Sequence, residues 1–178
     1  FASILDTYGV SLTTGPIADN DAQHYYNMGG PLYLLPNVNS SSYTGSLSGG
    51  YVYLPISLGI NYPQNSTTDD TESTEESKTT YTSLLDTSDD AVAKNNPNSM
   101  QDYGYEDGDD KGPFSVGLAV EDKVDDDHTT QLVVFASPYV FSDDASQMTT
   151  NNASLFSDVI GNMIMDTQSA GSVIPEKE

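Results

Sequence analysis

The chain has 178 residues, enough for one ordinary domain with its own core. Its 27 acidic residues stand against five Lys and no Arg. The resulting formal net charge of −22 excludes nucleic-acid phosphates and anionic lipid as partners, while favouring solubility and cation binding. The absence of Cys excludes disulfides and thiolate metal sites.

The ends of the sequence indicate a piece of a longer protein. The chain begins at Phe1, with no initiator Met and no signal peptide. It contains no apolar run close to the roughly 20 residues that cross a bilayer. We therefore expect a single domain over residues 1–178, with any membrane anchor outside this sequence.

The first third of the chain predicts a short helix followed by strands. Residues 1–8 carry apolar side chains at helical spacing, and Gly9 suits the position after the helix end. Proline cannot donate to a strand ladder, so Pro36 and Pro55 interrupt the strands that contain them. The expected strands lie at residues 10–12, 16–18, 31–38 and 51–60.

The middle of the chain is strongly polar. Residues 64–80 are rich in Ser, Thr, Asp and Glu, which predicts a low-complexity acidic insertion. A strand signal returns at residues 81–86, and residues 87–90 read as the turn that ends it. Residues 91–105 show little periodicity, and residues 106–111 form an acidic turn.

The last third predicts two strands and an amphipathic helix. Residues 113–121 alternate in hydrophobicity, whereas residues 132–136 form the continuous apolar run of a strand covered on both faces. Asn151 or Asn152 offers an N-cap for the helix, and residues 167–178 form a polar tail. One face of the helix is expected to pack on the sheet. Its apolar positions are Leu155, Phe156, Val159, Ile160 and Met163.

This order of elements predicts an α/β domain with a mixed sheet, few helices and long acidic loops. Residues in strands outnumber those in helices, which also leaves an α+β sandwich open.

Two acidic clusters contain oxygen ligands of the kind that Ca²⁺ prefers. They are Asp107, Asp109 and Asp110, and residues 125–127. Neither has the spacing of an EF-hand loop, so solvated loops are the main interpretation and Ca²⁺ binding is the alternative. His24 and His128 lie outside any metal-binding spacing and are expected at the surface.

The sequence lacks the nucleophile and phosphate-binding motifs of common enzymes. Ser88 and Ser137 follow predicted strands, where open α/β sheets place ligand crevices. The carboxylates expected nearby are Asp86, Asp89 and Asp143. Without Arg or a well-placed His this set is weak, and we expect no catalysis. The chain has twelve Tyr and no Trp. Packing in the core and the sheet is the main interpretation of the Tyr side chains, and a Tyr-rich surface that binds carbohydrate or a protein is the alternative.

Several segments, in order, resemble one family. They are LDTYGVSLTTGPIADND at residues 5–21, TSLLDTSDDA at 82–91, GPFSVGLAVE at 112–121, QLVVFASPYVFSD at 131–143 and NNASLFSDVIGNMI at 151–164. Together they are similar to the auxiliary-subunit family of ABC-2-type transport systems, which includes the gliding-motility-associated GldG-like proteins. The segment Ala136-Ser137-Pro138 departs from the family pattern, and the N-terminal half of the family's sheet has no counterpart.

The resemblance implies an extracytoplasmic domain of Rossmann- or amidotransferase-like topology, with no catalytic residues and no cofactor. It implies anchoring to a bacterial membrane by transmembrane helices outside this sequence, beside ABC permease and ATPase subunits or other surface-machinery proteins. We expect a non-enzymatic accessory domain; the alternative is a surface module for carbohydrate or Ca²⁺. The predicted interaction surface consists of Thr87, Ser88, Asp89, Ser137 and Asp143.

Overall fold

A computed structural model describes residues 2–47, 51–64, 79–96, 103–125, 128–149 and 151–169. Residues 65–78 of the predicted acidic insertion lie outside this part of the chain, as do residues 126 and 127 and residues 170–178 of the predicted tail. The elements, in order, are α1 (Ala2–Thr7), β1 (Ser11–Asp19), β2 (Tyr33–Leu34), β3 (Asn37–Val38), β4 (Leu54–Pro55), β5 (Leu58–Asn61), β6 (Thr79–Asp86), β7 (Ala91–Ala93), β8 (Asp110–Lys111), β9 (Ser115–Lys123), β10 (Thr129–Phe135), α2 (Asp143–Met148) and α3 (Asn151–Ser169).

The strands form one eight-stranded sheet and one two-stranded sheet. In the large sheet the order is β3-β6-β9-β5-β1-β7-β8, and β10 also pairs with β9. The small sheet contains β2 and β4. All of the pairings between described strands are antiparallel, so the expected mixed sheet is wrong. What holds is a small, mostly antiparallel α/β-type domain with few helices; the Rossmann- or amidotransferase-like topology is not confirmed.

Strand β9 is the centre of the sheet. It pairs with β6 along one side and with β10 along the other, and its start also meets β5. Tyr81 of β6 and Leu132 of β10 both lie opposite Val120. Because β6 and β10 are both antiparallel to β9, they run in the same direction and end at the same end of the sheet.

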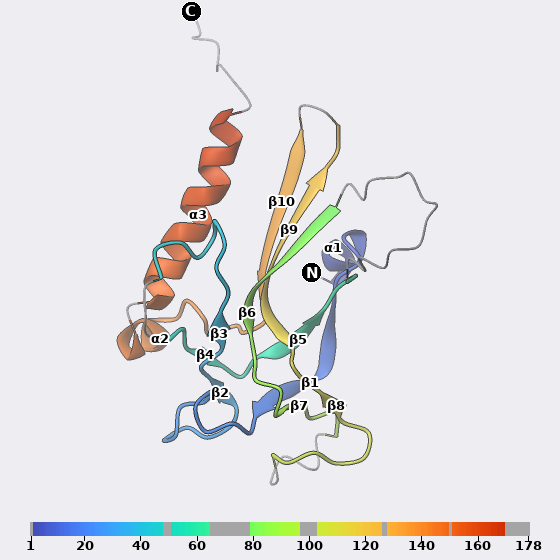
Figure 1. Ribbon diagram of the computed structural model, residues 1–178, viewed down its shortest axis with the longest axis vertical. Coiled ribbons are helices and arrows are strands. Elements are labelled where there is room, and N and C mark those ends of the chain that lie inside the picture. The colour runs from blue at the N-terminus through green and yellow to red at the C-terminus, as the bar shows by residue number, and fades with distance from the viewer. Residues whose placement is uncertain are drawn as a thin grey trace, which may run out of the picture.

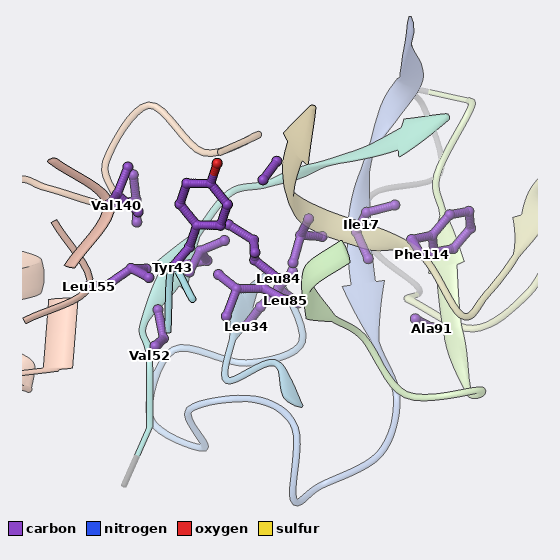
Figure 2. Packing of buried hydrophobic residues seen from close by; sticks show 14 of the residues in the cluster. Ile17, Leu34, Tyr43, Val52, Leu84, Leu85, Ala91, Phe114, Val140 and Leu155 are labelled. Atoms are coloured by element: carbon purple, nitrogen blue, oxygen red, sulfur yellow. The ribbon is translucent and has the colours of Figure 1, made fainter. Parts of the chain in front are cut away.

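Two apolar clusters hold the layers together. Figure 1 shows α1 and α3 on opposite sides of the three long strands. The larger cluster lies on the α3 side, where Leu155 and Val140 pack near Tyr43, Leu84 and Leu85 (Figure 2). The smaller cluster joins α1 to the other side of the sheet. Burying one such Leu contributes about 1.5–3 kcal/mol, so α3 is fixed mainly through its core-facing side chains.

The prediction that residues 132–136 are covered on both faces is only partly correct. Within this run Val134 and Ala136 are buried, but Leu132, Val133 and Phe135 are half-exposed. In the part of the chain that the structure describes, β9 is the one strand that pairs with β10. This apolar run therefore belongs to a strand whose faces pack on the core clusters but which, among the described strands, is paired along one edge only.

The N-cap prediction for α3 is also wrong. The helix already includes Asn151, whose N–H donates to Thr149 Oγ1 at 3.2 Å. The Asn152 side chain is fully buried instead. It accepts from Tyr53 N at 2.9 Å and donates to Tyr53 O at 2.8 Å and Val140 O at 2.6 Å. Asn152 thus joins the start of α3 to two other segments.

Candidate interaction surface

The predicted loop after β6 is held by internal hydrogen bonds. Ser88 donates from Oγ to Asp19 Oδ1 at 2.5 Å and from its backbone N to Asp19 Oδ2 at 2.9 Å. Thr87 Oγ1 accepts from Phe114 N at 2.9 Å. Both side chains are buried, whereas Asp89 is exposed. Of the three predicted surface residues in this loop, Asp89 remains available to a partner.

The Ser88–Asp19 contact places a hydroxyl against a carboxylate but does not form an activated nucleophile. The Asp19 carboxylate also accepts from Asp21 N at 3.1 Å, and Ser88 Oγ accepts from Asp90 N at 3.2 Å. A general base needs a free site for the proton and a nucleophile needs access to substrate. Here both groups are buried and hydrogen-bonded to neighbouring backbone N–H groups, so the pair fixes a turn.

The second predicted loop, after β10, is anchored elsewhere. Ser137 is buried, donates from Oγ to Pro55 O at 2.6 Å and accepts from Tyr139 N at 3.3 Å. Asp143 is exposed in the first turn of α2. The two loops leave the same end of the sheet, but one is tied to β1 and the other to β4. A binding role for Asp89 and Asp143 stays a prediction.

In the first acidic cluster, one carboxylate is already paired with a cationic side chain. Asp109 is buried and pairs with Lys94, whose Nζ lies 2.7 Å from Asp109 Oδ2. Burial opposes ionisation of Asp109, but the Lys94 hydrogen bond and the N–H groups of Glu106 and Asn95 outweigh it and lower its pKa. Among the described residues, no group of three or more His, Asp or Glu side chains is placed to hold a metal ion. The sequence missed this pair because Lys94 sits in a segment without periodicity.

The two histidines differ in their surroundings. His128 is exposed and its Nδ1 lies 2.7 Å from Asp125 Oδ1, as expected for a surface residue. His24 is half-buried, with Nδ1 3.0 Å from Asp21 Oδ2 and Nε2 3.2 Å from Asn37 Oδ1. The Gln23 N–H and the neighbouring His24 lower the pKa of Asp21 against the opposing effect of desolvation. His24 therefore helps to shape a loop.

A hollow of about 890 Å³ lies beside His24. Aromatic and amide side chains line much of it, among them Tyr25, Tyr26, Tyr51, Asn27 and Asn37. Aromatic faces and amide groups are suited to neutral polyols, since the rings stack on C–H surfaces and the amides hydrogen-bond hydroxyls.

An exposed apolar surface runs from β10 to α3. The ring of Phe141 lies 5.3 Å from that of Phe135 and 5.0 Å from that of Phe156. We call the exposed part of this surface the aromatic patch; it consists of Phe141, Phe156, Ile160 and Ile164, which are 40%, 49%, 40% and 52% exposed. The expectation that Phe156 and Ile160 pack on the sheet is wrong, because Leu155 and Val159 fill that role.

The aromatic patch continues into a hollow beside β10. This hollow of about 460 Å³ is lined by Val133, Val134 and Phe135 and by the loop of Ser137, Pro138, Val140, Phe141 and Ser142. Exposed apolar surface that spans several elements marks interaction sites in soluble proteins. The helical spacing of Phe156, Ile160 and Ile164 was the sequence signal for this surface, but it gave no sign of which residues the core would leave uncovered.

No family model, curated protein or solved structure matches this chain. Among the helices that the structure describes, none combines the length and the hydrophobicity needed to span a bilayer.

Proposed function

We propose that this chain is a non-enzymatic accessory domain of an ABC-2-type transport system and that it works by binding other proteins. The observation that supports the proposal most is the aromatic patch, whose apolar side chains extend from the loop after β10 along α3. Its composition fits the core of a protein interface, where aromatic residues are enriched and charged residues are depleted.

The family resemblance of the sequence motifs is the basis for the proposed partners. The motifs resemble the GldG-like auxiliary family, so the proposed partners are the permease and ATPase subunits of the same system or other surface-machinery proteins. The proposed location is the extracytoplasmic face of a bacterial membrane. The family's Rossmann- or amidotransferase-like topology belongs to this proposal too.

Co-purification tests this proposal. The chain is co-expressed with the permease and ATPase encoded next to its gene, and recovery of these subunits is compared between variants. Phe156→Asp and Ile160→Asp should each reduce recovery several-fold, because they place a charge in the patch. Ile4→Asp is the matched control, since Ile4 is also exposed but lies on α1. Equal recovery with all three variants, or no recovery with the unaltered chain, would refute the proposal.

The hollow beside His24 supports one alternative, a surface carbohydrate-binding module. Its Tyr and Asn side chains have the chemistry that neutral sugars require, and Tyr51 is 60% exposed. A thermal-shift screen with a glycan set tests it. A shift that disappears in Tyr51→Ala, while the melting temperature without glycan is unchanged, would favour this alternative.

A further inference from the structure

We propose that a partner protein adds an extended strand to the open edge of β10, with its side chains against the aromatic patch and with Lys or Arg next to the strand. This inference deepens the proposed function and rests on it. It specifies the conformation and the charge of the segment that is bound.

The edge of β10 lacks the protection that edge strands usually carry. Its apolar run packs on the core clusters through both faces, while among the described strands β10 pairs with β9 alone. Natural proteins protect edge strands with charge, proline or bulges. Val133, Val134 and Phe135 offer none of these devices, and their register with β9 is regular. The edge is therefore built to be paired.

The backbone N–H and C=O groups of β10 alternate in direction along the strand. Ala136 N donates to Val116 O at 3.1 Å, which fixes the alternation along the pair. Residues two and four positions earlier also face β9, so the N–H and C=O groups of Val133 and Phe135 point away from it. An extended polypeptide presents N–H and C=O groups at the matching spacing, and strand addition to a sheet edge is a recurring mode of peptide recognition.

An apolar hollow lies next to this edge. The hollow of about 460 Å³ includes both the outward side of β10 and Phe141 of the aromatic patch. Alternate side chains of an added strand would project toward this hollow, while its backbone pairs with Val133 and Phe135. Strand edge and apolar pocket together define a site for a short extended segment.

Charge decides which kind of segment fits. Asp143 and Asp144 are exposed directly after the loop that borders the hollow. The whole chain carries −22, so a second copy bringing the same edge would be repelled over the whole surface. A segment with Lys or Arg beside its apolar residues is attracted by the same field. The preferred occupant is therefore a basic extended segment of another protein.

Amide hydrogen exchange tests the inference. The probe is a synthetic peptide of about ten residues, with alternating Val and Thr between terminal Lys residues. Its control has the same sequence with alternate backbone nitrogens methylated, so that it cannot donate to a strand edge. We expect the first peptide to slow exchange of the Val133 and Phe135 amides at least about tenfold and to bind at least about tenfold more tightly than the control. The Val134 amide, which faces β9, should not change.

The possible outcomes separate this inference from the proposed function. Strand addition is supported if amide exchange slows with the first peptide and not with the methylated control. No change in exchange, or the same change with both peptides, overturns it even if co-purification with the transport subunits succeeds. A dimer in light scattering, with Val133 and Phe135 protected before peptide is added, overturns it in favour of a second copy. Loss of co-purification with slowed exchange intact would instead refute the proposed partners.

Discussion

The buried pair of Lys94 and Asp109 gives the sharpest stability prediction. The Lys94 side chain is 0% exposed and that of Asp109 is 1% exposed. Asp109→Asn removes the negative charge and leaves the ammonium in place. An uncompensated buried charge costs about 3–5 kcal/mol, so we expect the free energy of unfolding to fall by an amount in this range. For a domain of this size this corresponds to a loss of roughly 6–20 °C in melting temperature.

The remaining contacts place the loss near the lower end of this range. Lys94 Nζ keeps Gly104 O at 2.7 Å and a Glu106 carboxylate oxygen at 3.5 Å. Lys94→Met leaves Asp109 with two backbone donors, Asn95 N at 3.1 Å and Glu106 N at 3.0 Å. We expect about 3 kcal/mol for either single variant. The double variant Lys94→Met/Asp109→Leu should lose less than the sum of the two, because no buried charge is left unpaired.

Urea unfolding followed by circular dichroism measures these values. If each single variant costs under about 1 kcal/mol, as exposed ion pairs do, the pair is not buried as described. Additive losses in the double variant would also refute the reasoning, since they would mean that the two side chains do not interact.

The same pair predicts how stability depends on pH. The pKa of Asp109 is lowered from 3.8, so its contribution is present above that value and is lost as pH falls through the folded pKa. Burial acts to lower the pKa of Lys94, but Asp109 and Glu106 outweigh it and the pKa is raised from 10.5. Its contribution is present below 10.5 and is lost as pH rises through the folded pKa. Asp109→Asn should flatten the acid limb of the stability curve.

Three further substitutions test single contacts, each by urea unfolding. Gly15→Ala would place a Cβ 1.7 Å from Lys94 O, so we expect the free energy of unfolding to fall by at least about 2 kcal/mol. The control Gly161→Ala meets nothing within 4 Å and should raise the free energy of unfolding by about 0.5–1 kcal/mol through helix propensity. Equal effects of the two substitutions would contradict the close approach at Gly15. Asn152→Asp should lower the free energy of unfolding more than Asn152→Ala does, because a carboxylate would face two carbonyl oxygens. The reverse order would refute the hydrogen-bond assignment. Ile56 is 45% exposed at φ 53°, so Ile56→Gly should stabilise by about 1 kcal/mol, and a clear loss would show that the backbone there is unstrained.

The sequence predicted elements whose cause is local. The predicted interruptions at Pro36 and Pro55 are confirmed: Pro36 lies between β2 and β3, and β4 ends at Pro55. Gly9 follows α1 at φ 66°, a conformation that glycine adopts without a steric penalty. The strand predicted at residues 113–121 and the helix that begins near residue 151 also hold, since both rest on clear periodicity.

Features that depend on distant partners could not be predicted. Strand β7 (Ala91–Ala93) is too short for periodicity and is defined by pairing with β1 and β8. The buried roles of Lys94, Asp19 and Asn152 each require a partner from another part of the fold. The exposure of Phe156 depends on which α3 side chains meet the rest of the core, here Leu155 and Val159, and no residue pattern on the helix reveals this. The candidate site was predicted to lie after β6 and β10, and only its exposed carboxylates remain available there.

The pairing of β9 has a consequence for the order in which the chain folds. β9 and β10 are separated by only five residues in sequence, whereas the partners Leu12 and Ile60, or Tyr81 and Val120, come from distant parts of the chain. Closing a short loop loses less entropy, so the β9–β10 hairpin is the favoured nucleus, onto which β6 and then β5 with β1 assemble. Core substitutions in this hairpin should slow folding with φ-values of about 0.5–0.8, and substitutions in β7 should mainly accelerate unfolding. Equal φ-values in both regions would contradict this order of assembly.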